Sequence, residues 1–176
     1  ITTLTVNPAI DRGKDGKYYL IVKGDKPNET RFIRNQAVAV SDLPTGPFVI
    51  QEKPVIDYID TEDVSMWYDK NRDRFYGVFH AHGFIGMVTS PDGVNWKKAN
   101  EYVLMPKTIK MKDGSILKPD RLERPFIFTK DGIPTVLSLA AKKGDESFTV
   151  FIPLKNPPFP MPNSRQLAWQ EAELGV

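Results

Sequence analysis

The chain has 176 residues, enough for one domain with a sizeable core and too few for two. Its 24 Lys and Arg residues nearly balance 22 Asp and Glu residues, which excludes an extended polyanion-binding surface as the expected role. Cys is absent, so a disulfide scaffold and a thiolate metal site are excluded as well. The charge balance makes nucleic acid an unexpected partner. No apolar run approaches the roughly 20 residues of a membrane span, so a membrane is not an expected partner either.

Proline and glycine are scattered along the chain in short turn-like contexts, such as residues 43–47, 90–93 and 156–158. Since proline removes a ladder hydrogen bond and breaks helices, this distribution favours many short strands joined by tight turns. Helical periodicity is plausible near residues 165–174. The sequence therefore predicts an all-β, antiparallel chain with one short helix near its C-terminus.

Three segments of the chain share one plan, and they cover residues 7–23, 62–82 and 123–142. Each opens on polar residues, continues as an apolar strand, turns, and returns as a second apolar strand that ends on polar residues. The first two segments continue into third and fourth strands. Four antiparallel strands are the plan of a β-propeller blade. A sandwich of unrelated hairpins is the alternative that the same pattern allows.

The repeats divide the chain into three predicted blades, at about 1–52, 58–100 and 120–155, followed by a proline-rich C-terminal tail at 156–176. Propellers need about four to eight blades to close a ring. Three blades leave two flanks open, which is an aggregation liability. We therefore expect the chain to form a homo-oligomer or to associate with a missing N-terminal half.

A blade plan gathers polar residues on one face of the disc, because the second strand ends where the first strand starts. Carboxylates from different blades then converge on a central depression, as glycoside hydrolysis requires. Asp63 and Glu123 open the second and third repeats and are the candidate catalytic residues. The candidate substrate-binding residues are Glu62, His80, His82, Arg124, Lys142 and Trp67.

Apolar neighbours favour Glu123 as the proton donor. Leu122 and residues 125–127 should disfavour its ionisation, while Arg124 should point to the opposite face of an extended strand. A raised pKa would suit a general acid that works near neutrality. The same interpretation places Glu123 at the repeat position that matches Asp63.

Several candidates also have a purely structural interpretation. Glu62 and Asp63 could be a turn pair that accepts backbone hydrogen bonds. Glu123 and Arg124 could form a structural ion pair. Trp67 is either part of the core or a platform that stacks on sugar.

The two histidines, His80 and His82, lie on one face of a predicted strand. Two imidazoles can begin a metal site, but a third ligand is not apparent, so hydrogen bonding to substrate or packing at the rim is preferred. We therefore expect no metal at these residues and no cofactor. A divalent cation in the central channel is compatible with the plan.

Short motifs in the sequence carry a resemblance to known enzymes. Asn7-Pro8-Ala9-Ile10, Thr61-Glu62-Asp63-Val64 and Leu122-Glu123-Arg124-Pro125 open the three repeats, and further matching stretches lie at 15–20, 37–42, 44–48 and 90–96. Their order resembles the five-bladed propeller glycosidases of glycoside hydrolase family 43. It is more similar still to family 117, the 3,6-anhydro-L-galactosidases that split neoagarobiose. The stretch 90–96 also resembles the Asp-box turn of sialidases, which has a structural role there.

The resemblance implies roles for particular residues. Asp63 matches the Asp of family 43 that tunes the acid and orients substrate, and Glu123 matches the general acid in the following blade. The general base is implied to be an Asp in a blade N-terminal to Ile1, so the chain resembles the C-terminal half of such an enzyme. Family 117 members are thought to use a His beside the fourth-blade Glu, and Leu122 in that neighbourhood is a departure from this pattern.

The function expected from these observations is removal of a terminal sugar from an oligosaccharide by inversion, with water as the nucleophile. A noncatalytic carbohydrate-binding propeller is the alternative, because the expected base is not in this sequence. A protein-interaction propeller of the WD type is disfavoured, since its Gly-His and Trp-Asp signatures are missing. The expected location is the periplasm or the exterior of a bacterium rather than the cytoplasm.

Overall fold

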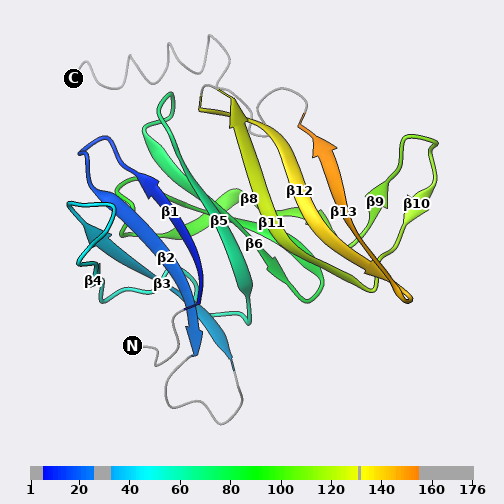
Figure 1. The fold of residues 1–176 in the computed structure, drawn as a ribbon, viewed down its shortest axis with the longest axis horizontal. Helices are drawn as coiled ribbons and strands as arrows, with labels where there is room; N and C mark the ends of the chain where they lie inside the picture. Colours follow the sequence, from blue (N-terminus) through cyan, green and yellow to red (C-terminus); the bar gives the residue numbers. More distant parts are fainter. Residues whose placement is uncertain (1–5, 26–32, 131, 155–176) are drawn as a thin grey trace.

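The computed structural model describes residues 6–25, 33–130 and 132–154, and every regular element in them is a strand (Figure 1). The all-β prediction is therefore confirmed. The helix predicted at 165–174 and the tail predicted at 156–176 lie outside the described residues. Within the described ranges, no helix suited to crossing a membrane is found.

The strands form three main antiparallel sheets that follow one another along the chain (Figure 1). The first sheet has the order β1 (Val6–Arg12), β2 (Tyr18–Asp25), β3 (Arg34–Ser41) and β4 (Val49–Ile50). The second has the order β5 (Glu62–Asp69), β6 (Arg74–Ala81), β7 (Phe84–Ser90) and β8 (Lys97–Pro106). The third contains β11 (Arg121–Lys130), β12 (Ile133–Lys143) and β13 (Glu146–Pro153). Between the second and third sheets the chain forms a short hairpin of β9 (Ile109–Lys110) and β10 (Ile116–Leu117).

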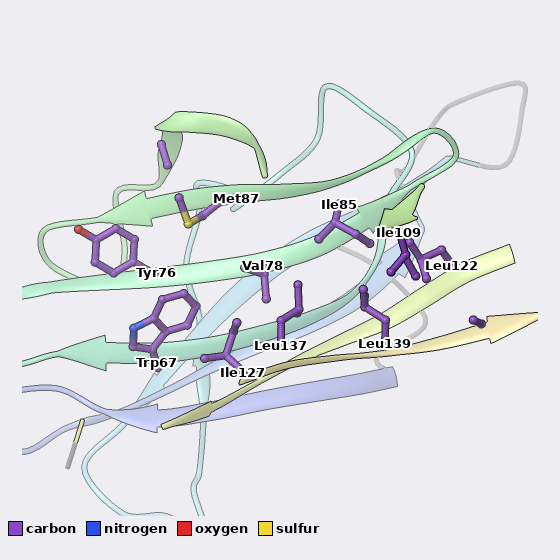
Figure 2. Close-up of a cluster of buried hydrophobic side chains, with 12 residues drawn as sticks. Trp67, Tyr76, Val78, Ile85, Met87, Ile109, Leu122, Ile127, Leu137 and Leu139 are labelled. Atoms are coloured by element: carbon purple, nitrogen blue, oxygen red, sulfur yellow. The ribbon is translucent and has the colours of Figure 1, made fainter. Parts of the chain in front are cut away.

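Apolar side chains fill the two spaces between neighbouring sheets. Between the first and second sheets, Ile21, Val38 and Phe79 are completely buried. Between the second and third sheets, residues of β5 to β8 meet residues of β11 and β12 (Figure 2). The first strands β1, β5 and β11 lie side by side. The middle sheet therefore buries both of its faces, as a blade within a propeller does.

Trp67 belongs to the core between the second and third sheets. The residue is 4% exposed and its ring stacks on Tyr76, with ring centroids 5.4 Å apart. Figure 2 shows the indole beside Ile127. The prediction that Trp67 binds substrate is wrong, because the face of the ring that a sugar would need is occupied by neighbouring side chains.

A β-bulge recurs near the start of the first strand in every sheet. The register shifts between Val6 and Ala9, between Glu62 and Ser65, and between Glu123 and Phe126. The first residue inside each shift has a left-handed backbone, with φ of 53° at Asn7, 50° at Asp63 and 51° at Arg124. A bulge adds one residue to one strand. Since the bulge occurs at the same point of the first strand in each sheet, its position aligns the three repeats residue by residue.

This alignment corrects one prediction. Glu123 matches Glu62, the residue just before the left-handed position, and does not match Asp63. The residue that matches Asp63 is Arg124. The sequence comparison aligned the repeats by their acidic residues, whereas the backbone aligns them by the bulge.

The stretch 90–96 forms a compact turn after β7. Asp92 accepts hydrogen bonds from Asn95 N at 2.7 Å, from Val94 N at 2.9 Å and from Ser90 Oγ at 3.0 Å. Partial burial raises the pKa of Asp92, but these hydrogen bonds outweigh it and lower the pKa to about 2. Trp96 Nε1 closes the turn by donating to Gly93 O at 2.7 Å. The turn thus has the structural role expected of an Asp-box.

Gly93 lets this turn pack against the first sheet. Its φ is +76°, and a Cβ added there would lie 3.0 Å from Phe75 Cε2 and closer still to the Tyr19 ring. We predict that Gly93→Ala lowers the free energy of unfolding by about 1–3 kcal/mol from overpacking, in addition to roughly 1–2 kcal/mol of backbone strain. Urea denaturation followed by circular dichroism measures the loss.

Gly114→Ala is the matched control. Gly114 has φ of +88° and no atom within 4 Å of an added Cβ, so this substitution carries the backbone strain without the clash. Equal losses of stability in the two variants would contradict the packing explanation.

Candidate active site

Polar ends of the sheets meet at a cavity of about 290 Å³. It lies where β5 and β11 begin and β6 ends. Its lining residues are Arg34, Asp60, Thr61, Glu62, His80, Ala81, His82, Lys107, Asp120, Arg121, Leu122 and Glu123. Four predicted site residues are thereby brought together, namely Glu62, His80, His82 and Glu123. A larger cavity of about 620 Å³ lies beside the turn after β1 and the loop after β3, at the opposite end of the strands.

Glu62 is held between two cations from the first sheet. Lys23 Nζ donates a hydrogen bond to Glu62 Oε1 at 2.5 Å, and Arg34 Nη1 lies 2.8 Å from Oε2. Burial raises the pKa of Glu62, but the hydrogen bonds and charges of Lys23 and Arg34 outweigh burial and leave the pKa below its usual value. Glu62 is therefore a carboxylate near neutral pH, which suits it poorly to donating a proton.

Asp60 fixes the position of Arg34. It accepts hydrogen bonds from Arg34 N and Nε, both at 2.9 Å, and from Nη2 at 2.6 Å. The side-chain bonds from Arg34 lower the pKa of Asp60 to about 2, against a smaller opposing effect of burial. The largely exposed His82 places Nε2 at 3.2 Å from Asp60 Oδ2. Asp60 thus connects the cation that binds Glu62 to one of the predicted histidines.

His80 lies between Asp63 and Glu62. Its Nδ1 is 3.5 Å from Asp63 Oδ2 and its Nε2 is 3.7 Å from Glu62 Oε2, both long for hydrogen bonds. Burial lowers the pKa of His80, and the charges of Asp63, Glu123 and Glu62 oppose this shift in part. The imidazole is therefore neutral near pH 7, and its Nδ1 has no hydrogen-bond partner among the described residues. Asn7 Nδ2 donates to the other oxygen of Asp63.

Glu123 has a charged partner on its own strand. Arg121 donates to Glu123 Oε1 from Nε at 2.6 Å and to Oε2 from Nη2 at 2.9 Å. The sequence argument for Glu123 considered Leu122, residues 125–127 and Arg124 but overlooked Arg121, which shares its face because residues two apart in a strand point the same way. Arg121 is 64% exposed, so water competes with this ion pair.

Asp63, Arg124 and Lys142 are absent from the lining of the cavity, although Asp63 lies directly behind His80. Arg124 is the exposed, left-handed residue of the third bulge. Lys142 is exposed opposite Arg121, beside a shallow groove of about 350 Å³ that Glu123 also lines. Their contact with substrate stays a prediction.

Arg34, Asp60 and Arg121 are among the charged cavity residues that were missed from the sequence. Arg34 opens β3 at the same end of the sheet as Lys23, and Asp60 lies two residues before β5. Arg121 opens β11. Each is a charged residue at a strand end on the predicted rim, and this position is the signal that could have found it.

A metal ion would find candidate ligands at one point of the site. Glu62, Asp63 and His80 offer ligand atoms that all lie within 4.8 Å of one another. The fit is poor, because both oxygens of Glu62 already contact Lys23 or Arg34, whose charges repel a divalent cation. A cation in the central channel stays a prediction.

The three sheets are blades of a β-propeller that this chain forms in part. No protein-family model matches the sequence, and no relative is found among curated proteins. Solved structures do match. A family-43 β-1,3-galactosidase in complex with galactodeoxynojirimycin has a TM-score of 0.59 and 13% identity, over 85% of this chain and 54% of its own.

Two further structures give the same result. A thermostable family-43 glycoside hydrolase has a TM-score of 0.58 and 15% identity, over 89% of this chain and 52% of its own. The catalytic domain of a family-62 α-L-arabinofuranosidase from Coprinopsis cinerea has a TM-score of 0.53 and 9% identity, over 86% of this chain and 47% of its own. At these identities the likeness shows the fold, which confirms the predicted propeller of the family-43 type. The chain spans about half the length of these structures.

Loss of Arg34 should change the charge state of the cavity. We predict that Arg34→Met raises the pKa of Asp60 from about 2 toward its ordinary value and raises the pKa of Glu62 as well. The folded-state pKa of Asp60 lies below its unfolded value, so its contribution to stability is present above about pH 4 and is lost as pH falls toward 2. This acid-dependent loss should shrink in the variant.

Carboxyl ¹³C NMR titration measures both pKa values, and urea unfolding between about pH 2 and pH 5 measures the stability. Arg12→Met, an exposed substitution at the far end of β1, is the control. An unchanged Asp60 pKa in Arg34→Met would contradict the assignment of its cause.

Proposed function

We propose that this chain is part of a glycoside hydrolase that removes a terminal sugar from an oligosaccharide by inversion. The observation that carries the proposal is the cavity at the ends of β5, β6 and β11, which Glu62 and Glu123 both line from the same bulge position of neighbouring blades. Glycoside hydrolysis uses carboxyl groups that converge on one cavity, and this arrangement supports the proposal. The propeller likeness to families 43 and 62 supports the same function.

Glu123 is the better proton donor of the two glutamates. Glu62 is bound by Lys23 and Arg34, whose side chains are 15% and 21% exposed, so its negative charge is held inside the site. The partner of Glu123 is the mostly exposed Arg121, which can turn toward solvent or a sugar hydroxyl when substrate enters. Glu123 can then take up a proton and deliver it to the leaving oxygen.

His80 orients the sugar in this proposal, and Asp63, which does not line the cavity, acts through His80. The neutral ring of His80 lines the cavity and can donate a hydrogen bond from one nitrogen while it accepts one on the other. Asp63 lies next to Nδ1 and biases the orientation of the imidazole.

The water-activating base is proposed to be an Asp of another blade, as the resemblance to family 43 implies. A separation of about 6.5–9.5 Å between its carboxyl group and that of Glu123 leaves room for a water and gives inversion. The resemblance to family 117 suggests neoagarobiose as the substrate, split in the periplasm or outside the cell. Arg124 and Lys142 would then contact the part of the substrate that extends beyond the cavity.

A noncatalytic carbohydrate-binding propeller is the second candidate. The observation in its favour is that Glu62 and Glu123 are both paired with cations, which keeps carboxylates available to accept hydrogen bonds from sugar hydroxyls. Incubation of the protein with agar, arabinan and xylan oligosaccharides separates the two functions. Release of a monosaccharide supports the hydrolase, and saturable binding without release supports the binding protein.

Glu123→Gln should affect substrates according to their leaving groups. A natural disaccharide needs protonation of the leaving oxygen, so we predict a loss of turnover on the order of 10²–10⁴. An aryl glycoside with a good leaving group needs little acid assistance and should lose far less. The measurement is kcat on both substrates in the protein with its complete ring. Glu101→Gln, at an exposed position of β8, is the control. Equal losses on both substrates would shift the acid role to His80 or His82.

Asp63→Asn removes a charge without disturbing the backbone. Asn7 occupies the same bulge position in the first sheet with a φ of 53°, so Asn is compatible with this conformation. We predict a fall in kcat of about a hundredfold, as is typical for loss of a positioned electrostatic group, with little change in Tm. A large fall in Tm with unchanged kcat would show that Asp63 is a structural residue of the bulge.

A further inference from the structure

His80 faces the candidate cavity with only one of its two ring nitrogens. Nε2 lies 3.7 Å from Oε2 of Glu62, which lines the cavity, whereas Nδ1 lies 3.5 Å from Oδ2 of Asp63, which does not. Nδ1 is buried and has no hydrogen-bond partner among the described residues. A ligand in the cavity can therefore form a hydrogen bond with the imidazole through Nε2 alone. Whether Nε2 donates or accepts that bond depends on which nitrogen carries the proton.

The two carboxylates beside His80 differ in how far their charges are compensated. Oε2 of Glu62, the oxygen that faces Nε2, is already 2.8 Å from Arg34 Nη1. In the described part of the chain, the side-chain partners of Asp63 are His80 and the uncharged Asn7. Burial lowers the pKa of His80, and among the acids that oppose this shift Asp63 has the largest effect. The imidazole proton is therefore attracted more strongly to Nδ1 than to Nε2.

Asn7 holds Asp63 in this position. Its Nδ2 donates a hydrogen bond to Oδ1 of Asp63, which leaves Oδ2 directed at His80. Asn7 and Asp63 occupy the same left-handed position of neighbouring blades, with φ of 53° and 50°. Because the backbone of both residues belongs to the recurrent bulge, the first two sheets fix the carboxylate beside Nδ1 without help from a ligand.

We propose that His80 keeps its proton on Nδ1 and presents the lone pair of Nε2 to the cavity as a hydrogen-bond acceptor. His80 then selects a sugar hydroxyl that donates at this point, a role that rests on the proposed function. A sugar with an ether or carbonyl oxygen there would leave Nε2 unpaired and bind less well. Asp63 and Asn7 are positioning residues, because they determine the tautomer from behind the imidazole. An imidazole of this tautomer has no proton to give the leaving oxygen, which agrees with Glu123 as the proton donor.

The tautomer can be measured directly in protein labelled with ¹⁵N-histidine. Long-range ¹H–¹⁵N correlation spectra distinguish a protonated ring nitrogen from one that carries a lone pair. His80→Gln identifies the signals of His80, and His82→Asn identifies them if the first variant fails to fold. We expect Nδ1 to be protonated and Nε2 to be unprotonated near neutral pH. A wild-type protein with the proton on Nε2 would overturn the proposal.

Matched carboxylate variants test the cause of the tautomer. In Asp63→Asn the oxygen that Asn7 binds becomes an amide carbonyl, so the new NH₂ group faces Nδ1 and donates to it. We expect the proton to move to Nε2, so that the protonated and unprotonated ¹⁵N signals change places. Glu62→Gln is the control, because it removes the carboxylate beside Nε2 and should leave the proton on Nδ1. An unchanged tautomer in Asp63→Asn, or a reversed one in Glu62→Gln, contradicts the role of Asp63.

Oligosaccharides separate this inference from the proposed function. Agar, arabinan and xylan oligosaccharides are titrated into the labelled protein. One that binds should shift the Nε2 resonance of His80 toward that of a hydrogen-bonded acceptor, while Nδ1 stays protonated. Binding or hydrolysis with an unchanged Nε2 resonance would overturn the acceptor role and leave the proposed function intact. A spectrum that none of the three perturbs would overturn the sugar-binding role together with the proposed function, while the tautomer would stand.

Discussion

Burial of one sheet face on another is the interaction on which the rest of this structure depends. The middle sheet loses contact with water on both sides, and Val78, Phe79 and Leu139 have no exposed area. Complete burial of such a side chain contributes about 1.5–3 kcal/mol, more than an exposed ion pair does. The sheets are therefore positioned by their apolar centres. The strand ends are left available for polar residues that contribute little to holding the sheets together.

Those strand ends bring together charges of opposite sign from different sheets. The first sheet supplies the cations Lys23 and Arg34, and the segment that opens the second sheet supplies Asp60 and Glu62. Each of these charges compensates a partner that lies far away in sequence, so the cavity gathers carboxylates with cations beside them. His80 stays neutral in the same surroundings because its burial outweighs the attraction of three nearby acids. The cavity thus holds carboxylates and a neutral imidazole side by side.

The sheets could be predicted from the sequence because each strand is an apolar run between turn residues, as at Tyr18–Asp25 and Phe84–Ser90. The meeting of Glu62, His80 and Glu123 followed from hairpin topology, which determines which strand ends lie together. The residue-by-residue alignment of the three repeats could not be predicted from the sequence in this way. A bulge shifts pairing by one residue, and the shift between Glu123 and Phe126 is visible in the backbone pairing but not in the order of acidic residues.

The prediction for Trp67 was wrong, and Arg34 and Arg121 were missed, for different physical reasons. A blade in the middle of a propeller buries both faces, so β5 shows no alternation of apolar and polar residues that would tell a core Trp67 from an exposed one. Arg34 and Arg121 have long side chains, and their partners depend on distances that the strand pattern does not contain. Arg34 reaches Asp60 and Glu62 across a gap between sheets, while Arg121 folds back onto Glu123 within one strand.

The recurrent bulge has a consequence for how such a protein can change. The left-handed backbone is the same in three sheets, yet the residue that adopts it is Asn7 in one, Asp63 in the next and Arg124 in the third. The bulge therefore accepts a neutral polar, an acidic or a basic side chain at this position. Substitutions there can alter the charge and hydrogen bonding of the cavity while the packing between blades stays as it is. Propeller blades can therefore acquire new specificities one at a time, without compensating changes in the core.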